Sequence, residues 1–518
     1  MLLLALTGCL PTLPVAEAAH EQPGPSLVVL VVLDQYALSL HEEMRGSYTA
    51  GLGRFEGDSA WIGTGRYPYA CTWTGPGHAT LATGRLPAEH GVAANRWYQD
   101  DAPAVVDAHG PEQFLAANPP ISTTADAVVA QGGRAVALSM KERGARFLGG
   151  SHPTLTGWLG PDDALEVGGE PSAQASFGVD RSGPPASWTW SLFTPRADLR
   201  GADVSAWEPR GVGSITFPHS APGDLGPLYA PTAGTWLTAL ATRAVGTLGL
   251  GSHERPDLLT LSFSEVDYVG HRFTPESWEA QDNLRVLDRD LGALFATLDS
   301  RYGPDGKPLR YAVLLTADHG VLPTPAAMMS GWDVAERAEA ALSAAGIPGA
   351  VTWLDPGLTL TGVAASRHDE AVRVVMDAAR SADNVGIVAP GSGPIAASTP
   401  YRDEIDHCRV AGRAADVLVW PRWGVGVMDE DHVDRGARPT HPPNIEATGH
   451  GTPYAYDREV PILAFGAGIS AHPRPGAGDD QTAAYYDMRR IAPTLASLAD
   501  VPGVGDLAGA PLPLGARN

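Results

Sequence analysis

Two pairs of acidic and imidazole side chains are the residues of this chain best suited to chemistry. Asp267 and His271 lie four residues apart, and Asp318 is followed directly by His319. Carboxylate and imidazole groups are both ligands of Zn²⁺ in proteins. Two such pairs predict two metal ions, and two adjacent divalent ions are typical of enzymes that hydrolyse phosphate esters or related bonds.

Apolar segments with the pattern of buried strands precede these pairs. Leu258–Phe263 precedes the first pair, Tyr311–Thr316 precedes the second, and Leu27–Leu33 ends directly before Asp34. Uninterrupted apolar runs are typical of parallel strands, and open α/β sheets bind ligands at the carboxyl ends of such strands. Leucines at steps of three and four over residues 284–298 predict an amphipathic helix between two of them. We therefore expect an α/β fold with a mostly parallel central sheet flanked by helices.

A threonine at a predicted turn supplies a candidate nucleophile. Thr74 precedes Gly-Pro-Gly, and a helix is expected from about Thr80, so a backbone amide and the helix dipole could receive a phosphoryl oxygen there. A threonine hydroxyl attacks poorly unless it is ionised, which metal coordination can achieve; the alternative is a threonine that only caps a helix. Asn95 is either an oxyanion donor or a turn residue. His78 and His90 are expected to stabilise the turn through hydrogen bonds.

Two cations and one further histidine complete the candidate site. Lys141 and Arg143 follow the strand-like segment 135–139. On a continuing strand they would point to opposite faces, whereas in a loop they could converge on one anion; the alternative is a solvated surface pair. His450 lies between two glycines, which allow close approach of a metal ion or of another backbone segment.

Composition restricts the class of protein. With 518 residues, 44% of them hydrophobic and 18% charged, the chain is typical of a globular protein. A formal net charge of -23 argues against nucleic-acid binding and means that an anionic substrate needs local positive charge, such as metal ions. Cys71 and Cys408 could form a disulfide in an oxidising compartment or remain two buried thiols.

The N-terminal segment has the features of an export signal. Residues 1–25 are expected to be a signal peptide or a lipoprotein signal with a tail. Leu6-Thr7-Gly8-Cys9 looks like a lipobox, which would place a lipid on Cys9, and Ala16–Ala19 offers a rival cleavage site; a disordered tail is the third alternative. Residues 26–510 are expected to form one catalytic domain with an irregular cap insertion at about 152–225, where tryptophans lie among Pro, Gly and Ser.

The order of these residues along the chain resembles the alkaline phosphatase superfamily, and within it the PafA-like bacterial phosphatases, which use threonine as nucleophile. The resemblance runs from about Val28 to the segment beginning at Ile491. It implies an alkaline phosphatase-like sheet with inserted cap regions. It also implies two zinc ions, one held by Asp267, His271 and His450 and the other by Asp34, Asp318, His319 and the Thr74 oxygen.

The resemblance also implies roles in catalysis. Asn95, Lys141 and Arg143 would contact phosphoryl oxygens, and Thr74 would become a phosphothreonine that a metal-bound water then hydrolyses. Because a monoester dianion carries more charge on its non-bridging oxygens than a diester does, the Lys–Arg pair favours monoesters. The sulfatase signature Cys-x-Pro-Ser-Arg is absent around Cys71, which argues against a formylglycine sulfatase.

The sequence therefore predicts an exported alkaline phosphatase with two zinc ions that acts on small phosphate monoesters. It would be periplasmic, anchored in the outer membrane or extracellular. The first alternative is a phosphodiesterase or nucleotide pyrophosphatase of the same superfamily, a branch that shares the Thr, the Asn and the metal ligands but lacks the basic pair. The second is a non-catalytic, metal-stabilised surface binding protein, although every nucleophile and ligand position is filled here.

Overall fold

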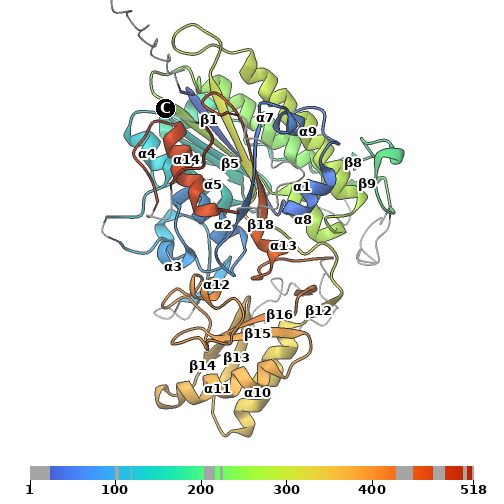
Figure 1. Cartoon of the computed structure of the whole chain (residues 1–518), viewed down its shortest axis with the longest axis vertical. Coiled ribbons are helices and arrows are strands. Elements are labelled where there is room, and N and C mark those ends of the chain that lie inside the picture. Colours follow the sequence, from blue (N-terminus) through green and yellow to red (C-terminus); the bar gives the residue numbers. More distant parts are fainter. Residues whose placement is uncertain are drawn as a thin grey trace, which may run out of the picture.

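A nine-stranded sheet forms the centre of the molecule in the computed structural model (Figure 1). The structure describes residues 24–99, 104–117, 119–203, 216–221, 226–427, 447–470, 485–505 and 510–515. From edge to edge, the strands are β19 (Tyr486–Asp487), β2 (Trp61–Arg66), β18 (Glu459–Gly466), β11 (Tyr311–Thr316), β1 (Leu27–Leu33), β10 (Asp257–Phe263), β5 (Ala135–Ser139), β6 (Leu155–Leu159) and β7 (Leu165–Gly169). Cys9 and all but the last two residues of the expected export segment lie outside the described residues.

The middle of the sheet is parallel. β1 pairs in parallel with β10 on one side and β11 on the other, and β5 continues the parallel order to β6. β18 is antiparallel to both of its neighbours, and β7 is antiparallel to β6. The predicted mostly parallel α/β sheet is therefore confirmed, and the carboxyl ends of β10, β1 and β11 lie side by side.

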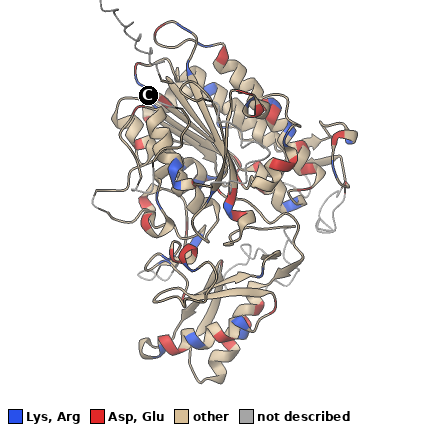
Figure 2. Ribbon diagram, viewed as in Figure 1, with Lys and Arg blue, Asp and Glu red and all other residues tan. Residues whose placement is uncertain are grey.

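Burial explains why these segments form central strands. Every residue of β1, β10 and β11 is buried. Figure 2 shows that charged residues lie mainly on the helices and loops, while the central strands contain few of them. Burying a Val or Leu side chain stabilises a fold by about 1.5–3 kcal/mol. A strand that is apolar on both faces is therefore stable only with helices on both sides.

Helices cover both faces of the sheet (Figure 1). On one face α2, α4, α5 and α14 contact one another, and on the other α7, α8 and α9 do so. α2 begins at Thr74 and not near Thr80, because proline is tolerated in the first turn of a helix, where its missing N–H has no intrahelical partner. The helices are α2 (Thr74–Thr83), α4 (Thr124–Ala130), α5 (Glu142–Gly149), α7 (Pro231–Thr247), α8 (Glu265–Phe273), α9 (Trp278–Asp299) and α14 (Ile491–Leu498).

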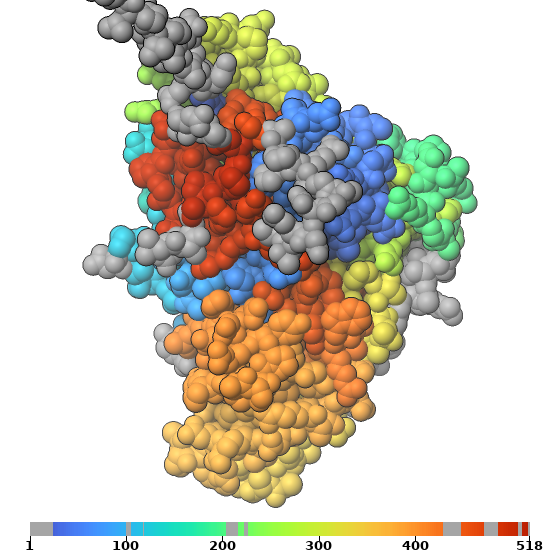
Figure 3. Space-filling model, in the orientation of Figure 1, coloured from blue at the N-terminus to red at the C-terminus, as the bar shows by residue number. Residues whose placement is uncertain are grey.

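Residues 331–427 build a second lobe that the sequence did not distinguish from the rest of the chain. Figure 3 shows it in yellow and orange at the lower end of the molecule. It has a four-stranded sheet and a hydrophobic core of its own. In sheet order the strands are β13 (Ala350–Leu354), β14 (Gly357–Thr361), β16 (Val417–Pro421) and β15 (Val385–Pro390), and its two long helices are α10 (Gly331–Ala344) and α11 (His368–Arg380).

The expected cap insertion at about 152–225 is only partly separate from the central sheet. β6 and β7 lie within that range and complete the sheet edge, since their backbone groups pair with β5 and with each other. After α6 (Pro171–Phe177), β8 (Trp188–Trp190) and β9 (His219–Ala221) form a ribbon. Its tryptophans pack against residues of α8 and α9.

The remaining short elements of the described chain are α1 (Leu38–Met44), α3 (Pro87–His90), α12 (Arg402–Asp406), α13 (Ala455–Arg458), β3 (Arg96–Gln99), β4 (Ala104–Asp107), β12 (Ala327–Met329) and β17 (Val425–Val427). No helix among the described residues is long and apolar enough to cross a membrane.

Candidate active site

Three aspartates meet at the carboxyl edge of the central sheet. Asp34 follows β1 directly, Asp318 lies two residues beyond β11, and Asp267 lies in the first turn of α8, just after β10. Their exposed fractions are 0%, 0% and 4%, respectively. Because β1 pairs with both β10 and β11, the three carboxylates converge although they are far apart in sequence.

Histidines join these aspartates in two groups. The first group contains Asp267 with His271 and His450, and the second contains Asp34 and Asp318 with His319. In each group one ligand atom per residue lies within 4.8 Å of the others. The structure thus brings together the side chains of each predicted ligand set, and Thr74 lies beside the second set.

The three histidines are oriented by backbone carbonyls. Each Nδ1–H donates to one oxygen: His271 to Thr448 at 2.8 Å, His319 to Gly320 at 2.9 Å and His450 to Thr72 at 2.8 Å. These bonds fix the orientation of each ring through Nδ1 and direct Nε2 at a carboxylate of its group. In His271 and His450, Nε2 lies 3.1 and 3.7 Å from Asp267 Oδ1. Every histidine of the two groups thus presents a metal-binding nitrogen to a carboxylate.

The second group has the donor set and the unsatisfied atoms of a cation site. Asp34 Oδ1, Asp318 Oδ2 and His319 Nε2 are buried and, among the described residues, have only ion-pair contacts of 3.1–3.5 Å with one another and with His78. Burial by itself lowers the pKa of His319, but Asp318 and Asp34 outweigh this effect and raise the pKa to about 9. Buried carboxylates need compensating positive charge. Two oxygen donors and one imidazole fit zinc, which is usually bound by four ligands in proteins.

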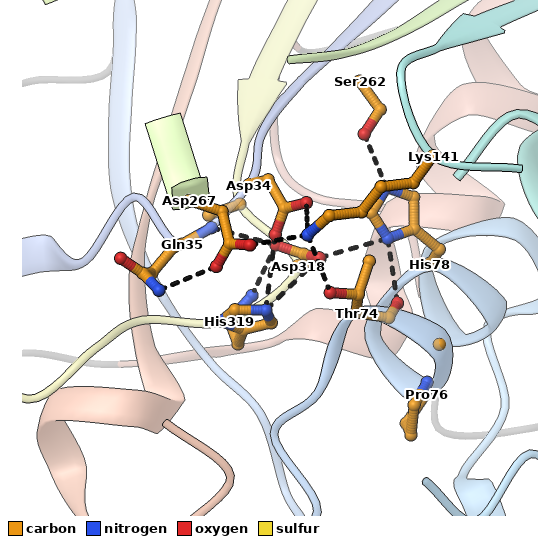
Figure 4. Close-up of polar contacts among 12 residues, drawn as sticks. Asp34, Gln35, Thr74, Pro76, His78, Lys141, Ser262, Asp267, Asp318 and His319 are labelled. Carbon is orange, nitrogen blue, oxygen red and sulfur yellow. Dashed lines mark hydrogen bonds and ion pairs between the residues drawn. The ribbon is translucent and has the colours of Figure 1, made fainter. Parts of the chain in front are cut away.

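Thr74 is the first residue of α2 and is 1% exposed. His78, one turn later, fixes this end of the helix: its Nδ1 lies 2.9 Å from the Thr74 carbonyl oxygen, and its Nε2 lies 2.8 Å from Ser262 Oγ (Figure 4). A Cβ on Gly77 would lie 2.3 Å from the Asp318 carbonyl oxygen, so glycine allows α2 to approach the metal ligands. The expected hydrogen-bonding role of His78 is confirmed.

His90 acts further along α2. Its Nε2 lies 3.2 Å from Thr80 Oγ1, and its Nδ1 accepts from the Val92 N–H at 3.1 Å. It therefore connects the helix to the following turn, and its ring also hydrogen-bonds the backbone of Pro76 in the nucleophile segment, as expected.

Lys141 extends its ammonium group between the two ligand groups. Nζ lies 2.7 Å from Asp34 Oδ2, 2.6 Å from Asp267 Oδ2 and 3.4 Å from Thr74 Oγ1 (Figure 4). Burial lowers its pKa, but attraction to Asp267 and Asp34 is stronger, so the pKa is raised and the group is cationic. The sequence left open a strand or a loop; instead the segment caps and begins α5.

Asn95 contacts the nucleophile segment, and Arg143 lies in the first turn of α5. Among the described residues, the Arg143 guanidinium has no hydrogen-bond or ion-pair partner, and its charge lowers the pKa of neighbouring Tyr268, which burial raises. Asn95 Oδ1 accepts from the Gly75 N–H at 2.8 Å, which leaves its amide N–H groups available. Asn95 can therefore donate to an anion beside Thr74, whereas Arg143 lies near Tyr268 of α8.

A disulfide joins the nucleophile segment to the second lobe. Cys71 and Cys408 are bonded, which answers the question that the sequence left open. Cys71 lies three residues before Thr74, and the intervening Thr72 hydroxyl donates to the Thr452 carbonyl at 3.0 Å. The segment that carries the nucleophile is therefore held both covalently and by the loop that carries His450.

Sequence reasoning missed Gln35 and Tyr268. Gln35 donates to Asp318 and Asp267, and the ring centroid of Tyr268 lies 5.0 Å from Lys141 Nζ. Their adjacency to Asp34 and Asp267 in the sequence was the only available signal.

Comparisons with known proteins agree on one family. The model for type I phosphodiesterase / nucleotide pyrophosphatase matches residues 28–451. Alkaline phosphatase PhoK of a Sphingomonas species is 28% identical over 92% of this chain and 89% of its own length. Alkaline phosphatase PafA of Elizabethkingia meningoseptica is 26% identical over 59% of this chain and 61% of its own length.

Solved structures show the same fold. A crystal structure of alkaline phosphatase PafA superposes with a TM-score of 0.76 at 22% identity, covering 95% of this chain and 99% of PafA. Murine ectonucleotide pyrophosphatase/phosphodiesterase 5 superposes with a TM-score of 0.55 at 13% identity, covering 92% and 96% of the two chains. The chain belongs to the type I phosphodiesterase/nucleotide pyrophosphatase family, and it shares the fold of alkaline phosphatase PafA.

Proposed function

We propose that this protein is an exported alkaline phosphatase with two zinc ions that hydrolyses small phosphate monoesters through a phosphothreonine at Thr74. The observation that carries the proposal is the contact of Lys141 with Asp34, Asp267 and Thr74, because it joins a cation, a nucleophile and both ligand groups. The relatives named alkaline phosphatase support a phosphatase activity. Zinc, when bound, would supply Lewis-acid stabilisation of the attacking and leaving oxygens.

The side chains of the site divide the remaining work. The Thr74 hydroxyl loses its proton and Oγ1 attacks phosphorus, while the bond from phosphorus to the leaving alcohol breaks and that alcohol takes up a proton. Asn95, Lys141 and Arg143 donate to the phosphoryl oxygens. Water then attacks the phosphothreonine, releases inorganic phosphate and restores the Thr74 hydroxyl. The N-terminal end of α2 favours the negative charge that both steps develop.

Charge supports a monoester substrate. A monoester dianion has one more negative charge than a diester, and the Lys141 ammonium lies 3.4 Å from the attacking oxygen. With the whole chain at -23, this local positive charge matters for binding an anion. The alternative, a phosphodiesterase or nucleotide pyrophosphatase, draws on the family model and the likeness to the phosphodiesterase structure.

Export is supported by the disulfide between Cys71 and Cys408, since disulfides persist mainly in oxidising compartments. The expected signal and the lipid on Cys9 belong to this part of the proposal. Fractionation of cells that produce the full chain, with Cys9→Ser as the comparison, tests it. Recovery of the intact chain in the cytoplasm would contradict export.

Paired kinetics test the reaction. We expect the zinc-loaded enzyme to turn over an aryl phosphate with a higher kcat/KM than the corresponding bis-aryl diester. Acid quench during monoester turnover should trap phosphate on Thr74, as located by mass spectrometry of peptides. A strong diester preference would favour the alternative. Full activity of Thr74→Ala would refute the nucleophile assignment, and absence of turnover of either ester would favour a binding protein.

A further inference from the structure

Gln35 contacts one carboxylate of each candidate metal group. Its backbone N–H donates to Asp318 Oδ1 at 3.2 Å, and its side-chain Nε2 donates to Asp267 Oδ1 at 2.7 Å. Gln35 is 2% exposed, so water does not compete effectively for either bond. Figure 4 shows the amide nitrogen directed at the Asp267 carboxylate. One residue thus connects the ligand groups that follow β10 and β11.

The backbone of Gln35 has an unusual conformation. Its φ is 69°, in the left-handed region that residues other than Gly, Asn and Asp rarely adopt. The chain leaves β1 here, between its two parallel neighbours, and turns directly after Asp34. This turn lets the N–H reach one neighbouring loop while the side chain reaches the other. Strained backbone of this kind is concentrated at functional sites.

Gly270 provides the space for the Gln35 amide. A Cβ built on Gly270 would lie 2.1 Å from Gln35 Oε1. Gly270 lies inside α8, between the ligands Asp267 and His271, and its φ is not positive. Its backbone therefore does not require glycine, but a larger residue would have to displace the buried Gln35 amide.

We propose that Gln35 is a positioning residue that orients Asp267 for metal binding while its backbone N–H is anchored on Asp318. The inference rests on the proposed two-metal site. The bond from Nε2 ends on Asp267 Oδ1, the same oxygen that lies within 3.1 and 3.7 Å of the His271 and His450 rings. Hydrogen bonds to metal ligands typically change metal affinity by about 10- to 100-fold.

The test is the rate at which the zinc-loaded protein loses zinc to a chromogenic chelator. Two phases are expected, and His271→Ala identifies the phase of the Asp267 group. Gln35→Asn keeps a residue that suits the left-handed backbone but shortens the side chain by one methylene. Gly270→Ala displaces the amide without altering Gln35. We expect both variants to accelerate the Asp267 phase about tenfold, and the control Gly246→Ala, in a helical position with nothing within 4 Å, to match the unmodified protein.

Wild-type zinc release from both Gln35→Asn and Gly270→Ala would overturn the inference, as would equal acceleration of both phases, which indicates general disruption. Excess zinc should restore full occupancy of both variants. Failure of the proposed function can be distinguished from failure of this inference. If the unmodified protein binds zinc but hydrolyses neither ester, the proposed function is refuted, and the zinc-release rates still test the role of Gln35. An unmodified protein that binds no zinc would refute both.

Discussion

Replacing Lys141 by methionine separates its charge from its size. The ammonium lies 3.4 Å from the attacking Thr74 Oγ1, so a phosphoryl oxygen at phosphorus would be about 4 Å away or nearer. Two unit charges about 4 Å apart interact by about 4 kcal/mol at an effective dielectric constant of about 20. The extra charge of a monoester is spread over several oxygens, and Arg143 remains, so we take about half of this value.

The expected loss is therefore about 2 kcal/mol more for a monoester than for a diester, or about 30-fold in the ratio of their kcat/KM values. Steady-state kinetics of an aryl phosphate and a bis-aryl diester measure this ratio at equal, verified zinc content. Lys307→Met is the matched control, because Lys307 is an exposed loop lysine. An equal loss for both esters, or no loss for the monoester, would refute the electrostatic reasoning.

Three further predictions concern stability. Cys71→Ser with Cys408→Ser opens a link across 337 positions and should lower the unfolding free energy by about 2–5 kcal/mol in denaturant titrations; an unchanged midpoint would contradict this. Burial lowers the pKa of His90 to about 3, so the unfolded chain takes up a proton that the folded chain does not as the pH falls from about 6.5 towards 3, and the folded state is destabilised. The His90→Gln variant should lose about 1.4 kcal/mol per pH unit of this pH dependence of the unfolding free energy. Denaturant titrations between pH 6 and 4 measure it. Removing metal with a chelator should lower the temperature of thermal unfolding. Added free zinc at about 1,000 times its Kd should restore about 4 kcal/mol of unfolding free energy per site. An unchanged unfolding temperature would argue against bound metal.

Much of the fold follows from the local sequence. The continuous apolar run Leu27–Leu33 is specific for a strand buried on both faces, and the structure confirms it at the centre of the sheet. The leucine repeat in 284–298 likewise lies within α9. The second lobe was not distinguished, because its helices and strands have the same periodicities as the main domain. Only tertiary packing shows that they enclose a hydrophobic core of their own.

Residue types and spacing by themselves indicated a two-metal hydrolase. Asp and His directly after apolar strands predict ligands at a sheet edge, and the structure brings Asp34, Asp267 and Asp318 to that edge because β1 lies between β10 and β11. Lys141 could not be oriented from sequence, since the direction of its side chain depends on whether the chain continues as a strand or begins a helix. The contacts of Gln35 likewise require a three-dimensional structure. They join residues more than 230 positions apart, which only strand order brings within hydrogen-bonding distance.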